Sequence, residues 1–187
     1  MVTVPAFVWR GGRVRRALTI GGAVGLSLGA LAWIDSGVWF TGVIVLVVLA
    51  VFYGIWMSRR MARYWPTAGQ LDGPDRERVA RTVRRGDPIG HEGLAQPGID
   101  YARGMRAAVE DARPFRWVVP LVLVVSVATA VWDSVFGSWG NLVASCIYLV
   151  LFFFEIFWWP KRRDRLLANA DRAADIAQQM LDEPKTP

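Results

Sequence analysis

The sequence predicts an all-α, polytopic membrane protein in which four transmembrane helices form two hairpins, accompanied by short cytoplasmic helices. Of its 187 residues, 53% are hydrophobic and only 20% are charged, against about 45–50% and about 25% in soluble domains. The apolar residues gather in four long blocks almost free of charge, and a run of about 18 apolar residues is long enough to cross a bilayer. All 22 Lys and Arg residues lie outside these blocks or, at Arg116, at the start of one.

The first hairpin is predicted over residues 17–57. Residues 1–16 form a short cytoplasmic segment with several arginines, and the first apolar block follows directly from Ala17 to Ile34. At 1.5 Å per residue this block is about 27 Å long as a helix. A tight turn at 35–37 leads into the second block, from Val38 to Met57. No small-residue cleavage site follows the first block, so we expect a retained helix and not a cleaved signal peptide.

Residues 58–115 are polar and are predicted to form a cytoplasmic loop that contains two helices. Gly73-Pro74-Asp75 places a proline and an acid where a helix begins. Residues 76–85 continue without a breaker, and Gly86 is suited to cap the carboxyl end. A second helix is expected over 99–112, ending before Pro114.

The second hairpin is predicted over residues 116–159, with spans from Arg116 to about Trp132 and from 141 to 159 around a turn at 133–140. Residues 160–187 form a cytoplasmic amphipathic tail. Its small and apolar residues recur at alternating spacings of four and three, which forms a seam able to pack on a neighbouring helix. This tail seam consists of Leu166, Ala170, Ala173, Ala177 and Met180.

The distribution of cations predicts the orientation. The two turns at 35–37 and 133–140 contain no Lys or Arg, whereas the segments 1–16, 58–115 and 160–187 hold nearly all of them. Lys and Arg are retained on the cytoplasmic side in loops of up to about 60 residues. We therefore expect both termini and the central loop to be cytoplasmic. The cations comprise 20 Arg and 2 Lys, a bias typical of GC-rich bacteria, so the expected location is a bacterial plasma membrane.

Three glycines in the first apolar block are spaced at intervals of four residues: Gly21, Gly25 and Gly29. This spacing lines one face of a helix without side chains, so that another helix can approach closely, and such packing drives association of helices in lipid. The glycine face, as we call these three residues, predicts a helix-packing interface. The spacing alone leaves open whether the partner is another helix of this chain or another subunit.

Glu155 is the only ionisable residue well inside a predicted span, about 7 Å from Pro160 along the helix. Intramembrane carboxylates are functional candidates by default, although shallow ones can reach the interface. Arg116 lies at a matching depth at the start of the third span, so we expect an intramembrane Glu155–Arg116 ion pair. A role of Glu155 in a transport path is the alternative.

The formal net charge of +6 is explained by contact with an anionic lipid leaflet, which contributes about 1 kcal/mol for each nearby cation. No nucleic-acid partner is expected. The residues predicted to contact anionic headgroups are Arg59, Arg60, Arg63, Arg78, Arg81, Arg85, Lys161, Arg162 and Arg163.

The sequence argues against an enzyme. The single histidine, His91, has no Ser or Cys near it in the sequence, and nucleophilic catalysis needs a base beside the nucleophile. The single cysteine, Cys146, excludes an intramolecular disulfide and any site with several cysteine ligands. No cofactor and no metal are expected.

The stretch from Gly73 to Ile89, GPDRERVARTVRRGDPI, resembles a segment of uncharacterised four-helix integral membrane proteins of actinobacteria. The resemblance covers 17 residues. It implies a lineage but no activity and no site residues.

Two classes of function remain. The first is a non-enzymatic accessory or scaffold subunit that docks on other membrane subunits of a larger complex through helix packing. The glycine face, the aromatic surface of the fourth span and the tail seam would serve as its contacts. The second is a small transporter or channel component, assembled as a homodimer, that uses Glu155 in its path.

Overall fold

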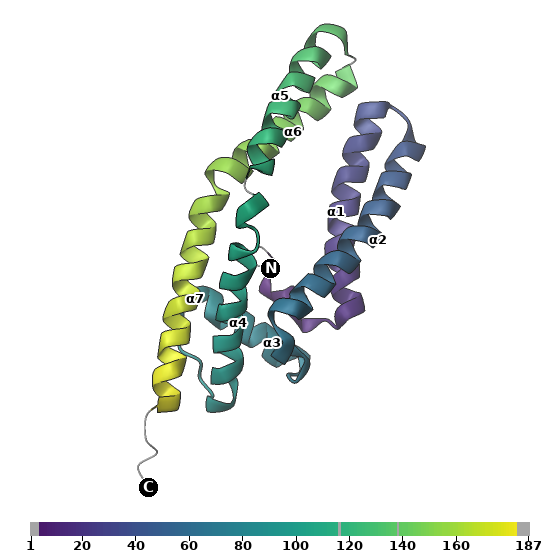
Figure 1. Ribbon diagram of the computed structural model, residues 1–187. Helices are drawn as coiled ribbons and strands as arrows, with labels where there is room; N and C mark the ends of the chain where they lie inside the picture. Colours follow the sequence, from purple (N-terminus) through teal and green to yellow (C-terminus); the bar gives the residue numbers. More distant parts are fainter. Residues whose placement is uncertain (1–3, 116, 138, 183–187) are drawn as a thin grey trace. The chain divides into compact units, whose positions relative to one another are not determined.

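The computed structural model in Figure 1 describes residues 4–115, 117–137 and 139–182. These residues form helices and no strand, which confirms the all-α class. The elements, in chain order, are the 3-10 helix η1 (Ala6–Arg10), α1 (Arg13–Ser36), α2 (Trp39–Tyr64), η2 (Pro66–Gly69), α3 (Gly73–Arg85), α4 (Glu92–Glu110), η3 (Arg113–Phe115), α5 (Val118–Phe136), α6 (Trp139–Phe157) and α7 (Trp159–Asp182).

The chain divides into two compact units. The first, which we call the head unit, combines three separate segments, 1–16, 57–111 and 162–187. The second, which we call the apolar unit, consists of 17–56 and 112–161. The predicted cytoplasmic segments are thus not three independent extensions, because they fold together.

Among the described residues, three helical stretches are long and apolar enough to cross a membrane. They are α1, α2 and the stretch from Trp139 to Asp182, which comprises α6 and α7. The apolar stretch of α5 is shorter, from Val118 to Trp132. Many large hydrophobic side chains of these helices are exposed, among them Phe52 at 69% and Phe153 at 61%. Such exposure is the arrangement expected of a protein whose solvent is lipid.

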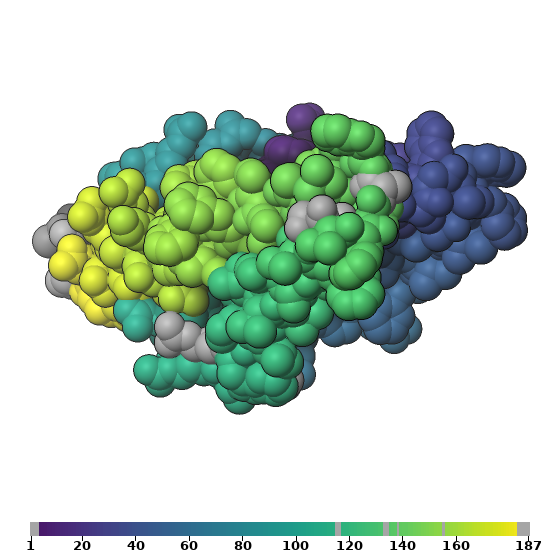
Figure 2. All heavy atoms as spheres, turned by 90° about the horizontal axis from the view of Figure 1, so that it is seen from above, coloured from purple at the N-terminus to yellow at the C-terminus, as the bar shows by residue number. Residues whose placement is uncertain are grey.

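Within the apolar unit, α5 and α6 pack against each other, and Figure 2 shows them side by side at the surface. In the other hairpin, α1 ends at Ser36 and Gly37 has a positive φ of 69°. The Gly37 amide donates a hydrogen bond to the Trp33 carbonyl at 2.9 Å. This left-handed glycine ends α1 in the manner usual for helix carboxyl ends.

The junction after the fourth apolar block differs from the prediction. The sequence predicts a span that continues to 159, directly before Pro160, but α6 ends at Phe157 and α7 begins at Trp159. Pro160 therefore lies in the first turn of α7, where the missing proline N–H would have had no helical partner in any case. The tail helix accordingly begins at Trp159, one residue before the predicted tail segment 160–187.

The head unit has its own core. Its largest fully buried side chains are apolar or aromatic and come from the first two of its segments: Trp9, Met61, Trp65, Val79, Val83, Tyr101 and Met105. Helix α4 starts at Glu92, seven residues before the predicted start at Ile99. The glycines and Pro97 in this stretch disfavour a helix, but Leu94 and Ala95 are buried there, and burial outweighs the local propensity.

Candidate interaction surfaces

The glycine face of α1 lies against α2 of the same chain. A Cβ atom placed on Gly25 would lie 2.6 Å from the Leu46 carbonyl oxygen, and one on Gly29 would lie 2.7 Å from the Gly42 carbonyl oxygen. A Cβ on Gly21 would clash with the Ala50 carbonyl. The backbones of α1 and α2 therefore lie closer together than side chains larger than a hydrogen atom at these glycine positions would allow.

The partner surface on α2 has its own periodicity, which the sequence analysis did not use. Gly42, Leu46, Ala50 and Gly54 follow one another at intervals of four residues, and each of them meets the glycine face. Two stripes of mainly small residues thus face each other within one hairpin. The structure assigns an intrachain partner to the glycine face.

Three aromatic residues from distant segments meet in the head unit. Trp9 of η1 lies with its ring centroid 4.8 Å from that of Trp65 and 5.6 Å from that of Tyr101. Trp65 and Tyr101 are 4.7 Å apart. All three are at most 1% exposed. Each such aromatic pair contributes about 0.5–1.5 kcal/mol beyond the buried area, so the cluster joins residues from 1–16, 57–65 and α4 into one core.

Burial in this cluster changes the chemistry of its one hydroxyl. The pKa of Tyr101 is raised by burial, while the positive charge of Arg84 acts in the opposite direction. Arg84 also donates a hydrogen bond to the Val4 carbonyl. It therefore fastens the amino-terminal segment to α3 beside the aromatic cluster.

Helix α7 completes the head unit through the tail seam. Ala170, Ala173 and Ala177 are fully buried. Asn169 donates from Nδ2 to the Arg84 carbonyl at 3.0 Å and so serves one of the last carbonyls of α3. The tail seam thus packs inside this chain, whereas the sequence analysis offered it as a contact for another protein.

An ion pair at the rim of the same contact links α7 to α4. Arg106 donates from Nε to Oδ1 of Asp171 at 2.5 Å, and its Nη2 lies 2.5 Å from Oδ2 of the same carboxylate. Asp171 raises the pKa of Arg106. The Arg106 side chain is 57% exposed, so the pair contributes at most about 1 kcal/mol.

Several of the cations predicted to contact lipid headgroups have partners within the protein. Arg78 pairs with Asp75 at 2.8 Å, and Arg81 pairs with Glu77. Arg60 lies over the Tyr64 ring at 5.1 Å and donates to the Ala108 carbonyl at 3.3 Å.

The other predicted lipid contacts differ in exposure. Arg163 is near Asp164 at 3.4 Å and is partly buried. Arg59, Arg63, Arg85, Lys161 and Arg162 have exposed side chains.

The predicted Glu155–Arg116 pair lies outside the described residues, since Arg116 and the side chain of Glu155 are not among them. His91 precedes the first turn of α4, and Cys146 is exposed on α6. Within residues 4–182, where the structure describes them, no three His, Cys, Asp or Glu side chains gather in a way that could hold a metal ion.

The chain matches no known protein-family model, and neither a characterised protein nor a solved structure shows significant similarity to it.

Proposed function

We propose that this chain is a non-enzymatic accessory or scaffold subunit of the bacterial plasma membrane, which holds a folded cytoplasmic head unit at the bilayer and docks on a larger membrane complex by helix packing. One observation carries the proposal: the segments that flank the apolar helices fold into a single unit. The core of that unit is filled by Trp9, Trp65 and Tyr101.

The composition of the head unit also supports a four-span topology. Residues 1–16, 57–111 and 162–187 belong to one compact unit and must therefore lie on the same side of a bilayer. An even number of crossings has to separate each segment from the next. Helices α1 and α2 provide two crossings between the first and the second segment. It follows that α5 and α6 cross as a pair or not at all, and the apolar character of both favours the pair.

The charge distribution supports a cytoplasmic location of the head unit. The exposed cations Arg59, Arg63, Arg85, Lys161 and Arg162 all belong to segments on that one side or to the junctions with them. The predicted outer turns, by contrast, contain no Lys or Arg. Cations on one side only are the signature of a cytoplasmic face.

Of the three docking contacts that the sequence indicated, two are occupied within the chain. The glycine face packs on α2, and the alanines of the tail seam are buried in the head unit. The aromatic surface of α6 is still exposed, with Phe153 at 61%, Phe154 at 56% and Phe157 at 60%. We therefore place the contact with the larger complex on α6.

Site-specific photo-crosslinking tests this function. A photoreactive phenylalanine analogue at Phe153 of α6 is compared with the same analogue at Phe52 of α2, which is 69% exposed and serves as the matched control. We expect position 153 to yield one discrete crosslinked product with a second membrane protein, and position 52 to yield none. A product of twice the chain's own mass at 153, or the absence of any protein product together with a monomeric purified chain, would contradict docking on a different protein.

A further inference from the structure

Three arginines line one cavity of the head unit. The cavity has a volume of about 220 Å³, and Arg13, Arg16 and Arg76 line it together with apolar residues that include Trp65 and Pro66. No Asp or Glu is among the described residues that line it. All of the lining residues belong to the head unit, so the cavity is a feature of one folded body.

Arg16 is the least usual member of this group, because it is only 5% exposed. Its Nε donates to the Gly11 carbonyl at 3.1 Å, and its guanidinium lies 5.1 Å from the centroid of the Trp9 ring. No carboxylate pairs with it among the residues that the structure describes. A buried charge without a counter-ion is unfavourable, so the fold holds Arg16 at an energetic disadvantage.

The charges nearest to Arg16 increase this disadvantage. Burial lowers the pKa of Arg16, and the positive charges of Arg76 and Arg13 lower it further. Arg16 alone is buried, whereas Arg76 is half-buried and Arg13 is exposed, and like charges close to a buried charge repel it. An anion in the cavity would relieve both the repulsion and the missing counter-charge.

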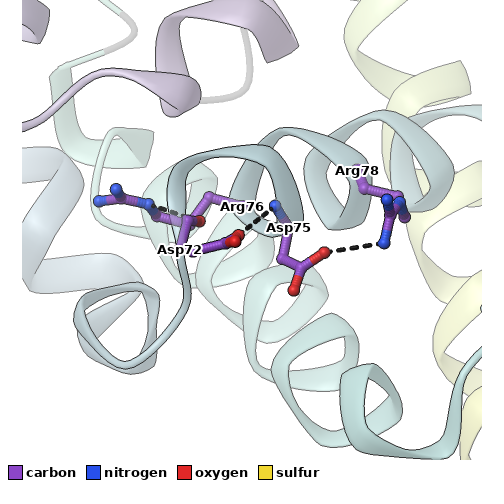
Figure 3. A network of polar contacts seen from close by, with 4 residues as sticks. All are labelled: Asp72, Asp75, Arg76 and Arg78. Atoms are coloured by element: carbon purple, nitrogen blue, oxygen red, sulfur yellow. Dashed lines mark hydrogen bonds and ion pairs between the residues drawn. The ribbon is translucent and has the colours of Figure 1, made fainter.

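The three acidic residues nearest in sequence to Arg76 have other partners, and the first of them, Glu77, pairs with Arg81. The Asp72 carboxylate accepts the Asp75 amide at 2.8 Å as the cap of α3, and the Asp75 carboxylate pairs with Arg78 at 2.8 Å. Arg76 donates from Nε to the backbone carbonyl of Asp72 at 3.1 Å. Figure 3 shows the guanidinium groups of Arg76 and Arg78 at opposite ends of this network.

We propose that this cavity is an anion site that binds a phosphate group through Arg13, Arg16 and Arg76. Guanidinium groups match the oxygens of phosphate and can donate to them in pairs. The amino end of α1 at Arg13 adds the positive end of a helix dipole. None of these three arginines is among those predicted from the sequence to contact lipid.

The phosphate can belong to an anionic lipid headgroup or to a free anion. Helix α1 continues from Arg16 directly into the apolar stretch that begins at Ala17, so a bilayer around that stretch ends close to the cavity. A lipid source depends on this membrane-spanning role of α1, whereas a free phosphate does not. Neither source depends on docking to a larger complex.

The test uses the full-length chain, purified in detergent and freed of lipid. Its thermal unfolding is followed with increasing inorganic phosphate, against chloride at equal ionic strength. Native mass spectrometry then measures the retention of phosphatidylglycerol against that of phosphatidylcholine.

Arg76→Gln removes one wall of the cavity, and Arg78→Gln removes an equal charge from the same helix outside the cavity. We expect at least one anion to bind, and Arg76→Gln to weaken its affinity about tenfold or more, with little change for Arg78→Gln.

The outcomes separate the two sources. Stabilisation by inorganic phosphate without retention of phosphatidylglycerol identifies a soluble anion as the ligand. If the chain retains phosphatidylglycerol, and inorganic phosphate then no longer stabilises it against thermal unfolding, the ligand is the lipid headgroup. Binding of neither, or an equal loss for Arg76→Gln and Arg78→Gln, would overturn the proposal. If Arg76→Gln does not fold, Arg13→Gln serves in its place, and unchanged affinity of that variant would equally overturn it.

Discussion

Trp9 and Trp65 meet edge to face, with ring centroids 4.8 Å apart and an angle of 70° between the ring planes. The first belongs to η1, before the first apolar helix, and the second follows the end of α2. Their contact closes the two ends of the α1–α2 hairpin against each other. The residues at both ends of the apolar hairpin thereby become part of the folded head unit.

Trp9→Ala should loosen the head unit. Trp9 is fully buried, and removal of a buried tryptophan side chain costs about 3–5 kcal/mol. We expect faster hydrogen–deuterium exchange of the α3 and α4 amides in the detergent-solubilised chain. Phe7→Ala is the matched control, because Phe7 belongs to the same short helix but is 60% exposed. Equal exchange in the two variants would show that the aromatic cluster does not hold the unit together.

Replacement of Gly22 or Gly25 of α1 by alanine should change the Tm in different directions. A Cβ on Gly25 would lie 2.6 Å from the Leu46 carbonyl oxygen and 2.9 Å from the Ala50 Cβ, whereas nothing lies within 4 Å of one on Gly22. Alanine favours a helix by about 0.5–1 kcal/mol over glycine. Gly22→Ala should therefore keep or raise the Tm in detergent, and Gly25→Ala should lower it because the α2 backbone has to shift, at a cost of about 1–3 kcal/mol. A rise in Tm for both would mean that α1 and α2 are not in close contact.

The parts of the fold that the sequence predicted well are those governed by local physics. The long apolar blocks yield long helices because a helix satisfies its own backbone hydrogen bonds in lipid. The stop at Gly86 was also predictable: α3 ends at Arg85, and Gly86 has a φ of 77°. Both features depend on residues that are close to one another in the chain.

The features that the sequence analysis missed depend on contacts between distant segments. Nothing in residues 1–16 marks Trp9 as a core residue, since a tryptophan near a predicted span is equally typical of a membrane interface. The seam on α7 was visible, but periodicity does not name its partner. Arg16 ended a cationic run in the sequence, and only the fold shows that it is buried beside Trp9.

Gly86→Ala should destabilise the contact between α3 and α7. The positive φ of Gly86 costs a residue with a side chain about 1–2 kcal/mol, and a Cβ there would lie 3.3 Å from the Asn169 Cα and from its carbonyl oxygen. Gly90→Ala is the control, since nothing lies within 4 Å of its Cβ position. We expect a lower Tm for Gly86→Ala alone, together with faster proteolysis of α7. An unchanged Tm would indicate that α7 adjusts without loss.

Cysteine labelling tests whether α5 and α6 cross the membrane as a pair. Cys146 is first replaced by serine, and single cysteines are then introduced at Val38, at Phe136 and at Gly90. Val38 and Phe136 are exposed at the two predicted outer turns, at 50% and 71%, and Gly90 belongs to the head unit. A membrane-impermeant maleimide applied to intact cells should label positions 38 and 136, and should label position 90 only after permeabilisation. Labelling of 38 with protection of 136 would mean that α5 and α6 do not cross, because the head unit requires an even number of crossings between 111 and 162. Labelling of all three in intact cells would contradict a cytoplasmic head unit altogether.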